Sequence, residues 1–270
     1  MRIRLTRATL PGLVVLAAAL MTALLAAGST SAAPATCHGS PATIVGTDHD
    51  DSLTGTAGSD VVVLLDGDDF FDGLGGNDTV CGGEGEDFVV GGVGDDLLDG
   101  GDGIDQVRGD SFSATGDAIG DGGNDTIICG DGTDDRGGGD NFAPNGNASG
   151  NGGDDAISGC ERTTADNLAG GLASGDGGND TIQGCRGCIG DNNSFSGQTS
   201  GTGGNDTITG TPFRDIPVVG DNSGAGGGGD DDISTLGGRD VIDGGPANDR
   251  CDGGTGKDTA ENCETLIDIP

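Results

Sequence analysis

The feature that most constrains this chain is a nine-residue period that runs without insertion through residues 46–108. Each of the seven units has aspartate at its sixth position and an apolar residue at its eighth, and every unit but the first has glycine at its fourth. The composition is typical of disordered chains, because 60 of 270 residues are glycine, Trp and Tyr are absent and the net charge is −35. A disordered chain would not keep aspartates and apolar residues at the same two positions of every unit. The period therefore predicts a folded repeat.

A longer repeat follows Arg108. Aspartates at intervals of 25 to 30 residues each precede an isoleucine by two positions, in sequences such as GGNDTI. These isoleucines are Ile127, Ile157, Ile182, Ile208 and Ile233. Between them lies a second short motif, GDS, GDN or ADN, at 109–111, 139–141, 165–167, 190–192 and 220–222. Because a linker or an independent domain would not keep this phase, we expect the same solenoid to continue here, with the isoleucines stacked in one inward ladder.

The chain is expected to divide into five segments. The first, residues 1–35, has three arginines, an apolar run and then small residues, which is the organisation of a secretory signal peptide cleaved after Ala35 or Ala33. An uncleaved membrane anchor is the alternative, because the apolar run approaches the ~20 residues that a membrane span needs. The other segments are an N-terminal cap at 36–45, seven nonapeptides at 46–108, longer repeats at 109–234, and final nonapeptides with a C-terminal cap at 235–270.

Charge decides which partners such a chain can have. Removing the signal segment leaves 46 acidic and eight basic residues, so nucleic acid and anionic membranes would be repelled and neither is expected as a partner. The chain also repels itself, and its thin row of apolar residues cannot offset the ordering of so many glycines. A bound cation would supply the missing stability. Calcium binds carboxylate and carbonyl oxygens, both of which a turn rich in glycine and aspartate offers.

The pattern, best developed in GGEGEDFVV and GGVGDDLLD at 82–99, resembles the hemolysin-type calcium-binding repeat, the RTX nonapeptide of parallel β-rolls. The resemblance implies an all-β fold, a parallel β-roll or β-solenoid with two nonapeptides per coil. It also implies that several Ca²⁺ ions lie between turns and bridge units n and n+2. The pairs that would share an ion are Asp69 with Asp87, Asp78 with Asp96, and Asp87 with Asp105.

The expected metal ligands are the aspartates at the sixth position and the glycines at the fourth position of the best-matched units. They are Asp51, Asp60, Asp69, Asp78, Asp87, Asp96, Asp105, Asp125, Asp155, Asp180, Asp206, Asp231, Asp240, Asp249, Asp258, Gly76, Gly85, Gly94 and Gly103.

Eight cysteines all follow the signal segment, so an exported chain should carry disulfides. The expected pairs are Cys37 with Cys81 at the N-terminal end, Cys251 with Cys263 around the last repeat, and Cys160 with Cys185 in neighbouring coils. The last pair is expected because each cysteine follows the inward isoleucine of its repeat by three residues, so stacking brings the two within disulfide reach. Cys185 and Cys188 also form the one C-x-x-C motif, for which a redox or zinc site is the weaker interpretation.

No catalytic motif of the hydrolase, zinc-protease or P-loop type occurs in the sequence. We therefore expect a secreted, non-enzymatic protein that binds calcium and folds on binding several ions. One alternative is an adhesion or matrix protein that binds an extracellular protein or polysaccharide through the extended loops at 110–121, 141–151, 167–176 and 192–202. A weaker alternative is an enzyme with an acidic site on the solenoid.

Overall fold

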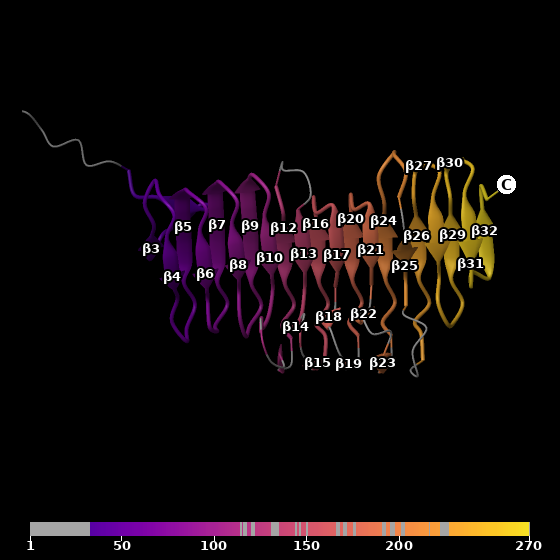
Figure 1. The fold of residues 1–270 in the computed structure, drawn as a ribbon, viewed down its shortest axis with the longest axis horizontal. Helices are drawn as coiled ribbons and strands as arrows, with labels where there is room; N and C mark the ends of the chain where they lie inside the picture. Colours follow the sequence, from indigo (N-terminus) through magenta and orange to yellow (C-terminus); the bar gives the residue numbers. More distant parts are fainter. Residues whose placement is uncertain are drawn as a thin grey trace, which may run out of the picture. The chain divides into compact units, whose positions relative to one another are not determined.

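The repeats fold into two long parallel β-sheets that share one thin core (Figure 1). The structure is a computed structural model. It describes residues 33–269 except 114, 116–117, 120–121, 131–134, 144, 146, 150, 166–167, 170–171, 175–176, 191–192, 195–197, 201–202, 216 and 222–226. Every regular element in this part of the chain is a strand. No helix within it could cross a membrane.

The first sheet has eleven strands and receives one from each coil. In spatial order these are β3 (Ile44–Val45), β5 (Val61–Asp66), β7 (Thr79–Glu84), β9 (Leu97–Asp102), β12 (Thr126–Ile128), β16 (Ala156–Ser158), β20 (Thr181–Gln183), β24 (Thr207–Thr209), β26 (Asp232–Ser234), β29 (Arg250–Asp252) and β32 (Thr265–Ile267).

The second sheet has ten strands, each of which follows a strand of the first sheet in the chain. They are β4 (Ser52–Thr54), β6 (Phe70–Asp72), β8 (Phe88–Val90), β10 (Gln106–Arg108), β13 (Arg136–Gly138), β17 (Arg162–Thr164), β21 (Gly187–Ile189), β25 (Val218–Val219), β28 (Val241–Asp243) and β31 (Thr259–Glu261). One coil is thus a strand of the eleven-stranded sheet, a turn, a strand of the ten-stranded sheet and a second turn.

Strand register confirms the predicted parallel roll. Val62 pairs with Val80 and Val80 with Leu98, so each coil in this region holds two nonapeptides. The longer repeats continue the same sheet, because Leu98 pairs with Ile127 and Ile127 with Ile157. The remaining isoleucines follow in order through Ile182, Ile208 and Ile233. The predicted ladder of stacked isoleucines is therefore present.

Additional short strands occur where the coils are longer. The structure forms a four-stranded parallel sheet from β11 (Ala118–Ile119), β15 (Ala148–Ser149), β19 (Leu172–Ser174) and β23 (Gln198–Ser200). A three-stranded sheet contains β14 (Phe142–Ala143), β18 (Leu168–Ala169) and β22 (Asn193–Ser194). All seven belong to the turns that lead from the ten-stranded sheet back to the eleven-stranded one. Figure 1 shows β14, β15, β18, β19, β22 and β23 along one side of the long sheets. The described parts of the predicted loops thus contribute strands.

Two small pairs complete the elements. β1 (Thr36–Cys37) and β2 (Ser40–Pro41) are antiparallel, and β27 (Gly237–Gly238) is parallel to β30 (Thr255–Gly256).

The core consists mostly of one inward side chain per strand, although β5 contributes both Val62 and Leu64 and β13 has Gly137 at its inward position. In the eleven-stranded sheet these residues are fully buried from Val62 to Cys251, and in the ten-stranded sheet they include Phe71, Val89 and Ile242. Such a row is only one side chain thick, so much of the interior consists of polar turns. The buried polar residues are mostly aspartates.

Four disulfides join parts of this core. Cys37 bonds Cys81 and Cys251 bonds Cys263, the pairs expected at the two ends. The predicted bond between Cys160 and Cys185 is wrong, because the structure joins Cys129 to Cys160 and Cys185 to Cys188. Cys129 directly follows β12 and lies one coil before Cys160, while Cys188 is the inward residue of β21 in the same coil as Cys185. Each cysteine therefore has a nearer partner than the one predicted.

Candidate metal sites

A column of carboxylates runs along the turns that enter the eleven-stranded sheet. In each turn the Oδ1 atom of the aspartate accepts a hydrogen bond from the backbone N–H of the corresponding aspartate one coil earlier, at 2.7–3.0 Å. This first column contains Asp60, Asp78, Asp96, Asp125, Asp155, Asp180, Asp206, Asp231, Asp249 and Glu264. Glu264 is its last member, with Oε2 at 2.9 Å from the Asp249 nitrogen. The column is continuous from the turn before β5 to the turn before β32.

A second column occupies the turns that enter the ten-stranded sheet. It contains Asp51, Asp69, Asp87, Asp105 and Asp135, and further along Asp215, Asp240 and Asp258, joined by the same hydrogen bonds. Between these two runs the corresponding positions hold Glu161 and Arg186, which directly precede β17 and β21. Arg186 Nη1 lies 2.7 Å from Glu161 Oε1. A salt bridge between a glutamate and an arginine thus replaces two aspartates of this column.

The other carboxylate oxygen in most of these aspartates has no partner. It is buried without a hydrogen bond in Asp69, Asp78, Asp87, Asp96, Asp105, Asp125, Asp155, Asp206, Asp231, Asp240, Asp249 and Asp258. Leaving a buried charged oxygen unsatisfied costs several kcal/mol or more, unless a proton or a cation is bound. The columns therefore have the property expected of a metal-binding site.

Glycines make room for these oxygens. A Cβ atom added to Gly73 would lie 2.4 Å from Oδ2 of Asp78, and one added to Gly82 would lie 2.4 Å from Oδ2 of Asp87. The fourth-position glycine has positive φ, at 142° in Gly85, and a Cβ there would lie 2.0 Å from the carbonyl oxygen of Gly67. No side chain other than hydrogen fits such a position. Backbone carbonyls and buried carboxylates are thereby packed together in the turns.

Burial shifts the acidity of the columns. It raises the pKa of Asp78 to about 6 and the pKa values of Asp87 and Asp96 to about 7, against an ordinary value of 3.8. The hydrogen bond from the preceding coil lowers each pKa, and the negative charge of neighbouring aspartates raises it again. Burial raises the pKa of Asp125 to about 8. Without a cation, these carboxyls would bind protons at a higher pH than exposed aspartates do.

The donor set fits calcium. A hard divalent cation prefers carboxylate and carbonyl oxygens and accepts them in irregular arrangements. Unpaired Oδ2 atoms recur from coil to coil, and the glycines predicted as ligands, Gly76, Gly85, Gly94 and Gly103, all have positive φ in the same turns. When bound, a calcium ion would neutralise the columns and satisfy the unpaired oxygens.

Two of the predicted ligands differ from the others. Oδ2 of Asp51 accepts the N–H of Thr47 at 2.6 Å, and Oδ2 of Asp60 accepts the N–H of Thr56 at 2.7 Å. Asp215 receives the same bond from Thr211 at 2.8 Å. In these three turns a threonine stands at the second position, where most repeats have glycine, and it supplies the donor. Asp51 and Asp60 therefore lack the unpaired oxygen found at the other sites.

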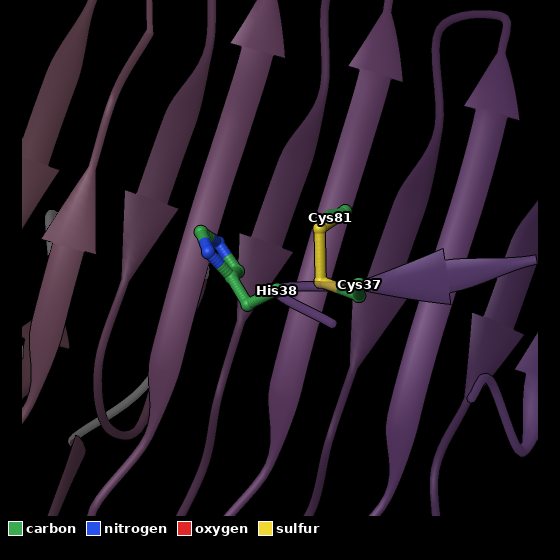
Figure 2. Close-up of side chains that lie close together, drawn as sticks. All are labelled: Cys37, His38 and Cys81. Atoms are coloured by element: carbon green, nitrogen blue, oxygen red, sulfur yellow. A yellow bond between two sulfur atoms is a disulfide. The ribbon is translucent and has the colours of Figure 1, made fainter. Parts of the chain in front are cut away.

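A group of different ligand type lies at the N-terminal end. Among the described residues, Cys37, His38 and Cys81 are the one set of three histidine, cysteine or acidic side chains whose ligand atoms all lie within 4.8 Å (Figure 2). The two sulfur atoms form a disulfide and so offer no thiolate. His38 Nε2 instead lies 3.2 Å from Oδ2 of Asp99. This group is a structural clip.

Sequence reasoning missed several column members. The repeat pattern did not predict Asp135, because Gly137 occupies the position at which the pattern requires an apolar residue. Sγ of Cys160 fills that space, 2.5 Å from where a Cβ of Gly137 would be. The pattern did not predict Asp215, because its inward apolar residue, Val218, follows it by three positions and the pattern requires a spacing of two. The signal that could have found both is the turn position itself, since Asp135 immediately precedes β13 and Asp215 lies three residues before β25 in the ten-stranded sheet.

An outer ladder accompanies the first column at the fifth position of the turns. The N–H of Asn124 donates to Oδ1 of Asp95 at 3.0 Å, and the N–H of Asp154 donates to Oδ1 of Asn124 at 2.9 Å. The pattern continues through Asn179, Asn205, Asp230 and Asn248. Its donors lie in the later coil, whereas in the first column they lie in the earlier coil. The two neighbouring N–H groups of each turn are thus satisfied from opposite sides.

Comparison with protein families gives one match. A family model described as the RTX calcium-binding nonapeptide repeat (4 copies) matches residues 45–80, 82–113, 172–187, 200–216 and 225–260, which together are just over half of the chain. The longest unmatched stretch within the repeats contains Glu161, where the second column lacks aspartate. No curated protein and no solved structure matches the chain significantly.

Proposed function

Because the chain belongs to the family of RTX calcium-binding nonapeptide repeat proteins, we propose that it is a secreted protein whose fold depends on binding several calcium ions. The observation that carries this proposal is the recurrence of buried carboxylate oxygens without a partner in both columns. A single unpaired aspartate could be tolerated. Repeated in coil after coil, such groups would prevent the metal-free chain from packing at neutral pH.

The ions would be held by aspartates of successive coils together with backbone carbonyls of the turns. We assign this role to the column members whose second carboxylate oxygen is buried without a hydrogen bond, which are Asp69, Asp78, Asp87, Asp96, Asp105, Asp125, Asp155, Asp206, Asp231, Asp240, Asp249 and Asp258. Asp51, Asp60 and Asp215 would contribute less, since threonine already satisfies one oxygen of each. Aspartates one coil apart would share an ion, as in the pair Asp69 and Asp87.

Secretion is part of the proposal. Residues 1–35 would act as the signal peptide, and the four disulfides suit an oxidising compartment. Extracellular calcium sites commonly have dissociation constants of about 10⁻⁴ to 10⁻³ M. Sites of that affinity would stay empty in the cytosol, so the precursor would remain unfolded until export.

Calcium titration of the mature chain tests this function. Circular dichroism and light scattering in the presence of a chelator should show an expanded coil, and millimolar calcium should produce β signal and compaction. Magnesium at the same concentration serves as a control for charge screening. A chelated chain with the full β spectrum would contradict the proposal. Mass spectrometry of the exported protein would locate the N-terminus after Ala33 or Ala35.

A further inference from the structure

A third set of buried carboxylates lies at the base of the lengthened turns. Asp110 and Asp140 belong to the Gly-Asp motif that follows strands β10 and β13, and their side chains are 2% and 1% exposed. The N–H of Asp110 donates to the carbonyl of Gly139 at 2.9 Å, so the two motifs occupy equivalent places in adjacent coils. In the short repeats the same place holds Thr56, Leu74, Gly92 or Gly245, and the last three have positive φ. The longer turns thus have an aspartate where these short repeats have an uncharged residue.

The carboxylate of Asp110 closes the base of its turn. Its Oδ2 atom accepts the N–H of Gly123 at 3.1 Å, which joins the two ends of the segment between them. Asp221 does the same at a separate turn, where its Oδ2 accepts the N–H of Gly229 at 2.6 Å. Both glycines occupy the fourth position of their repeat. The recurrence indicates a built feature of the lengthened turns.

These aspartates approach the first column. A Cβ atom added to Gly122 would lie 1.7 Å from Oδ1 of Asp140 and 2.7 Å from Oδ2 of Asp110, so the two carboxylates are close neighbours. A Cβ on Gly109, the residue before Asp110, would lie 1.8 Å from Oδ2 of Asp125. Likewise Oδ2 of Asp155 lies 1.5 Å from the Cβ position of Gly139. The motif therefore brings carboxylates of two kinds together in each coil.

Three oxygens in this cluster have no hydrogen-bond partner. They are Oδ1 of Asp110 and the Oδ2 atoms of Asp125 and Asp155, all on side chains at most 2% exposed. Burial, the charge of Asp125 and contact with Asp140 together raise the pKa of Asp110 to about 10. Burial and then the charge of Asp140 likewise raise the pKa of Asp155. After burial, the negative charges of neighbouring aspartates are therefore the main cause that raises the pKa of Asp110 and of Asp155.

We propose that Asp110 and Asp140, together with Asp125 and Asp155, form an additional calcium site that shares Asp125 and Asp155 with the first column and ties the lengthened turns of these coils to the roll. The unpaired oxygens supply hard ligands, and Asp110 holds both the turn and the ion. Asp221 with Asp206 and Asp231 forms the corresponding site further along. A Cβ added to Gly220, the residue before Asp221, would lie 1.9 Å from Oδ2 of Asp231, and the N–H of Asp206 donates to Oδ1 of Asp231 at 2.9 Å. The motif recurs at 165–166 and 190–191, whose aspartates lie outside the described residues. That the ion is calcium rests on the proposed function, whereas its position rests on these contacts.

Counting bound calcium tests the site. The full chain and an Asp110→Asn/Asp140→Asn variant are compared by equilibrium dialysis against ⁴⁵Ca²⁺ and by isothermal titration calorimetry. Asparagine keeps an acceptor for the Gly123 N–H and removes only the charge. The variant should bind at least one calcium fewer per chain and keep the β spectrum at saturating calcium. Amide exchange at 122–124 should become faster in the variant. As a matched control, Asp66→Asn/Asp102→Asn neutralises two exposed aspartates and should leave the count unchanged.

An unchanged count in the Asp110→Asn/Asp140→Asn variant would overturn the inference, even with weaker affinity, because these aspartates would then only assist the column sites. Asp221→Asn offers an independent check at the second turn and should also lose one ion. An unchanged count there would equally contradict the inference. If the wild-type chain bound no calcium, the proposed function itself would fail, and this site with it.

Discussion

Oδ1 of Asp87 accepts the backbone N–H of Asp69, one coil earlier, at 2.9 Å, while Oδ2 of the same carboxylate is buried without a partner. One side chain therefore has two separate roles. Its first oxygen links neighbouring coils, and its second is left unpaired, where under the proposed function it would bind a cation. This division explains why aspartate is repeated at the position, since asparagine could provide the hydrogen bond but only a carboxylate provides both the bond and the charge.

Substitution of Asp87 by asparagine should weaken calcium binding while preserving the hydrogen bond to Asp69. We expect the calcium concentration at the folding midpoint to rise on the order of tenfold, which corresponds to ~1.4 kcal/mol. Circular dichroism during a calcium titration measures this midpoint. Asp66→Asn is the matched control, because Asp66 is exposed at the end of β5. Equal midpoints for the two variants would show that Asp87 is not a ligand.

Acid should favour the metal-free fold. The folded-state pKa values of about 7 for Asp96 and about 8 for Asp125 exceed the ordinary value of 3.8. Between these limits the folded chain binds more protons than the unfolded chain, so its stability increases as pH falls. This contribution is complete below 3.8 and is lost as pH rises through 7 to 8.

Circular dichroism of metal-stripped protein between pH 8 and pH 4 checks this dependence, and the β signal should grow toward acid. The affinity for calcium should instead fall toward acid, because protons and calcium compete for the same oxygens. A metal-free chain that stays unfolded at pH 4 would argue against protonation as a substitute for the ion.

Alanine at Gly85 should destabilise the calcium-loaded roll. The backbone there has φ of 142° and an added Cβ would lie 2.0 Å from the carbonyl oxygen of Gly67. We expect a loss of about 1–3 kcal/mol in the free energy of unfolding, measured by urea denaturation at saturating calcium. Gly58→Ala is the control, since no atom lies within 4 Å of its added Cβ. Similar effects of the two substitutions would mean that close packing of the coils is not what selects glycine.

Arg186→Asp should increase the calcium dependence of the second column. The substitution places a carboxylate beside Glu161 where the wild type has a salt bridge at 2.7 Å. Loss of that bridge costs only about 0.2–1 kcal/mol, because Arg186 is half-exposed. Repulsion between the two carboxylates adds a cost that calcium can remove.

Thermal unfolding at low and at saturating calcium measures the difference. The gap between the two midpoints should be wider for Arg186→Asp than for the wild type. Arg239→Asp makes the same charge change at an exposed position outside both columns and should leave the gap as it is. If the difference between the two midpoints were unchanged in both variants, the positive charge of Arg186 would not be taking the place of a bound cation in the second column.

The sequence was sufficient to predict the roll and most of one column. A fixed spacing between an aspartate and an inward isoleucine translates directly into strand register, as the pairing of Ile157 with Ile182 shows. Asp135 could not be found this way, because the inward space of its coil is filled by Cys160 from the next coil. Such a replacement depends on contacts between coils, which a pattern within one repeat does not contain.

The disulfides show the same limit. Cys160 and Cys185 have equal offsets from their isoleucines, which predicted a bond between them, but equal offsets do not determine which sulfur is nearest. The geometry of the turns gives Cys160 a partner in the preceding coil and Cys185 a partner within its own. Thr47 and Thr56 are a further example. Their N–H groups donate to Oδ2 of Asp51 and Asp60, two aspartates that the pattern predicts as metal ligands.

The opposite directions of the first column and the outer ladder have a consequence for the order of assembly. In the outer ladder the N–H of Asn205 reaches an acceptor on Asn179, which precedes it in the chain. In the first column the N–H of Asp180 reaches an acceptor on Asp206, which follows it. A coil added to a growing roll therefore finds one acceptor already in place and itself completes the coil beneath it. A chain that emerges amino-terminus first can build such a structure one coil at a time, with only its newest layer unfinished.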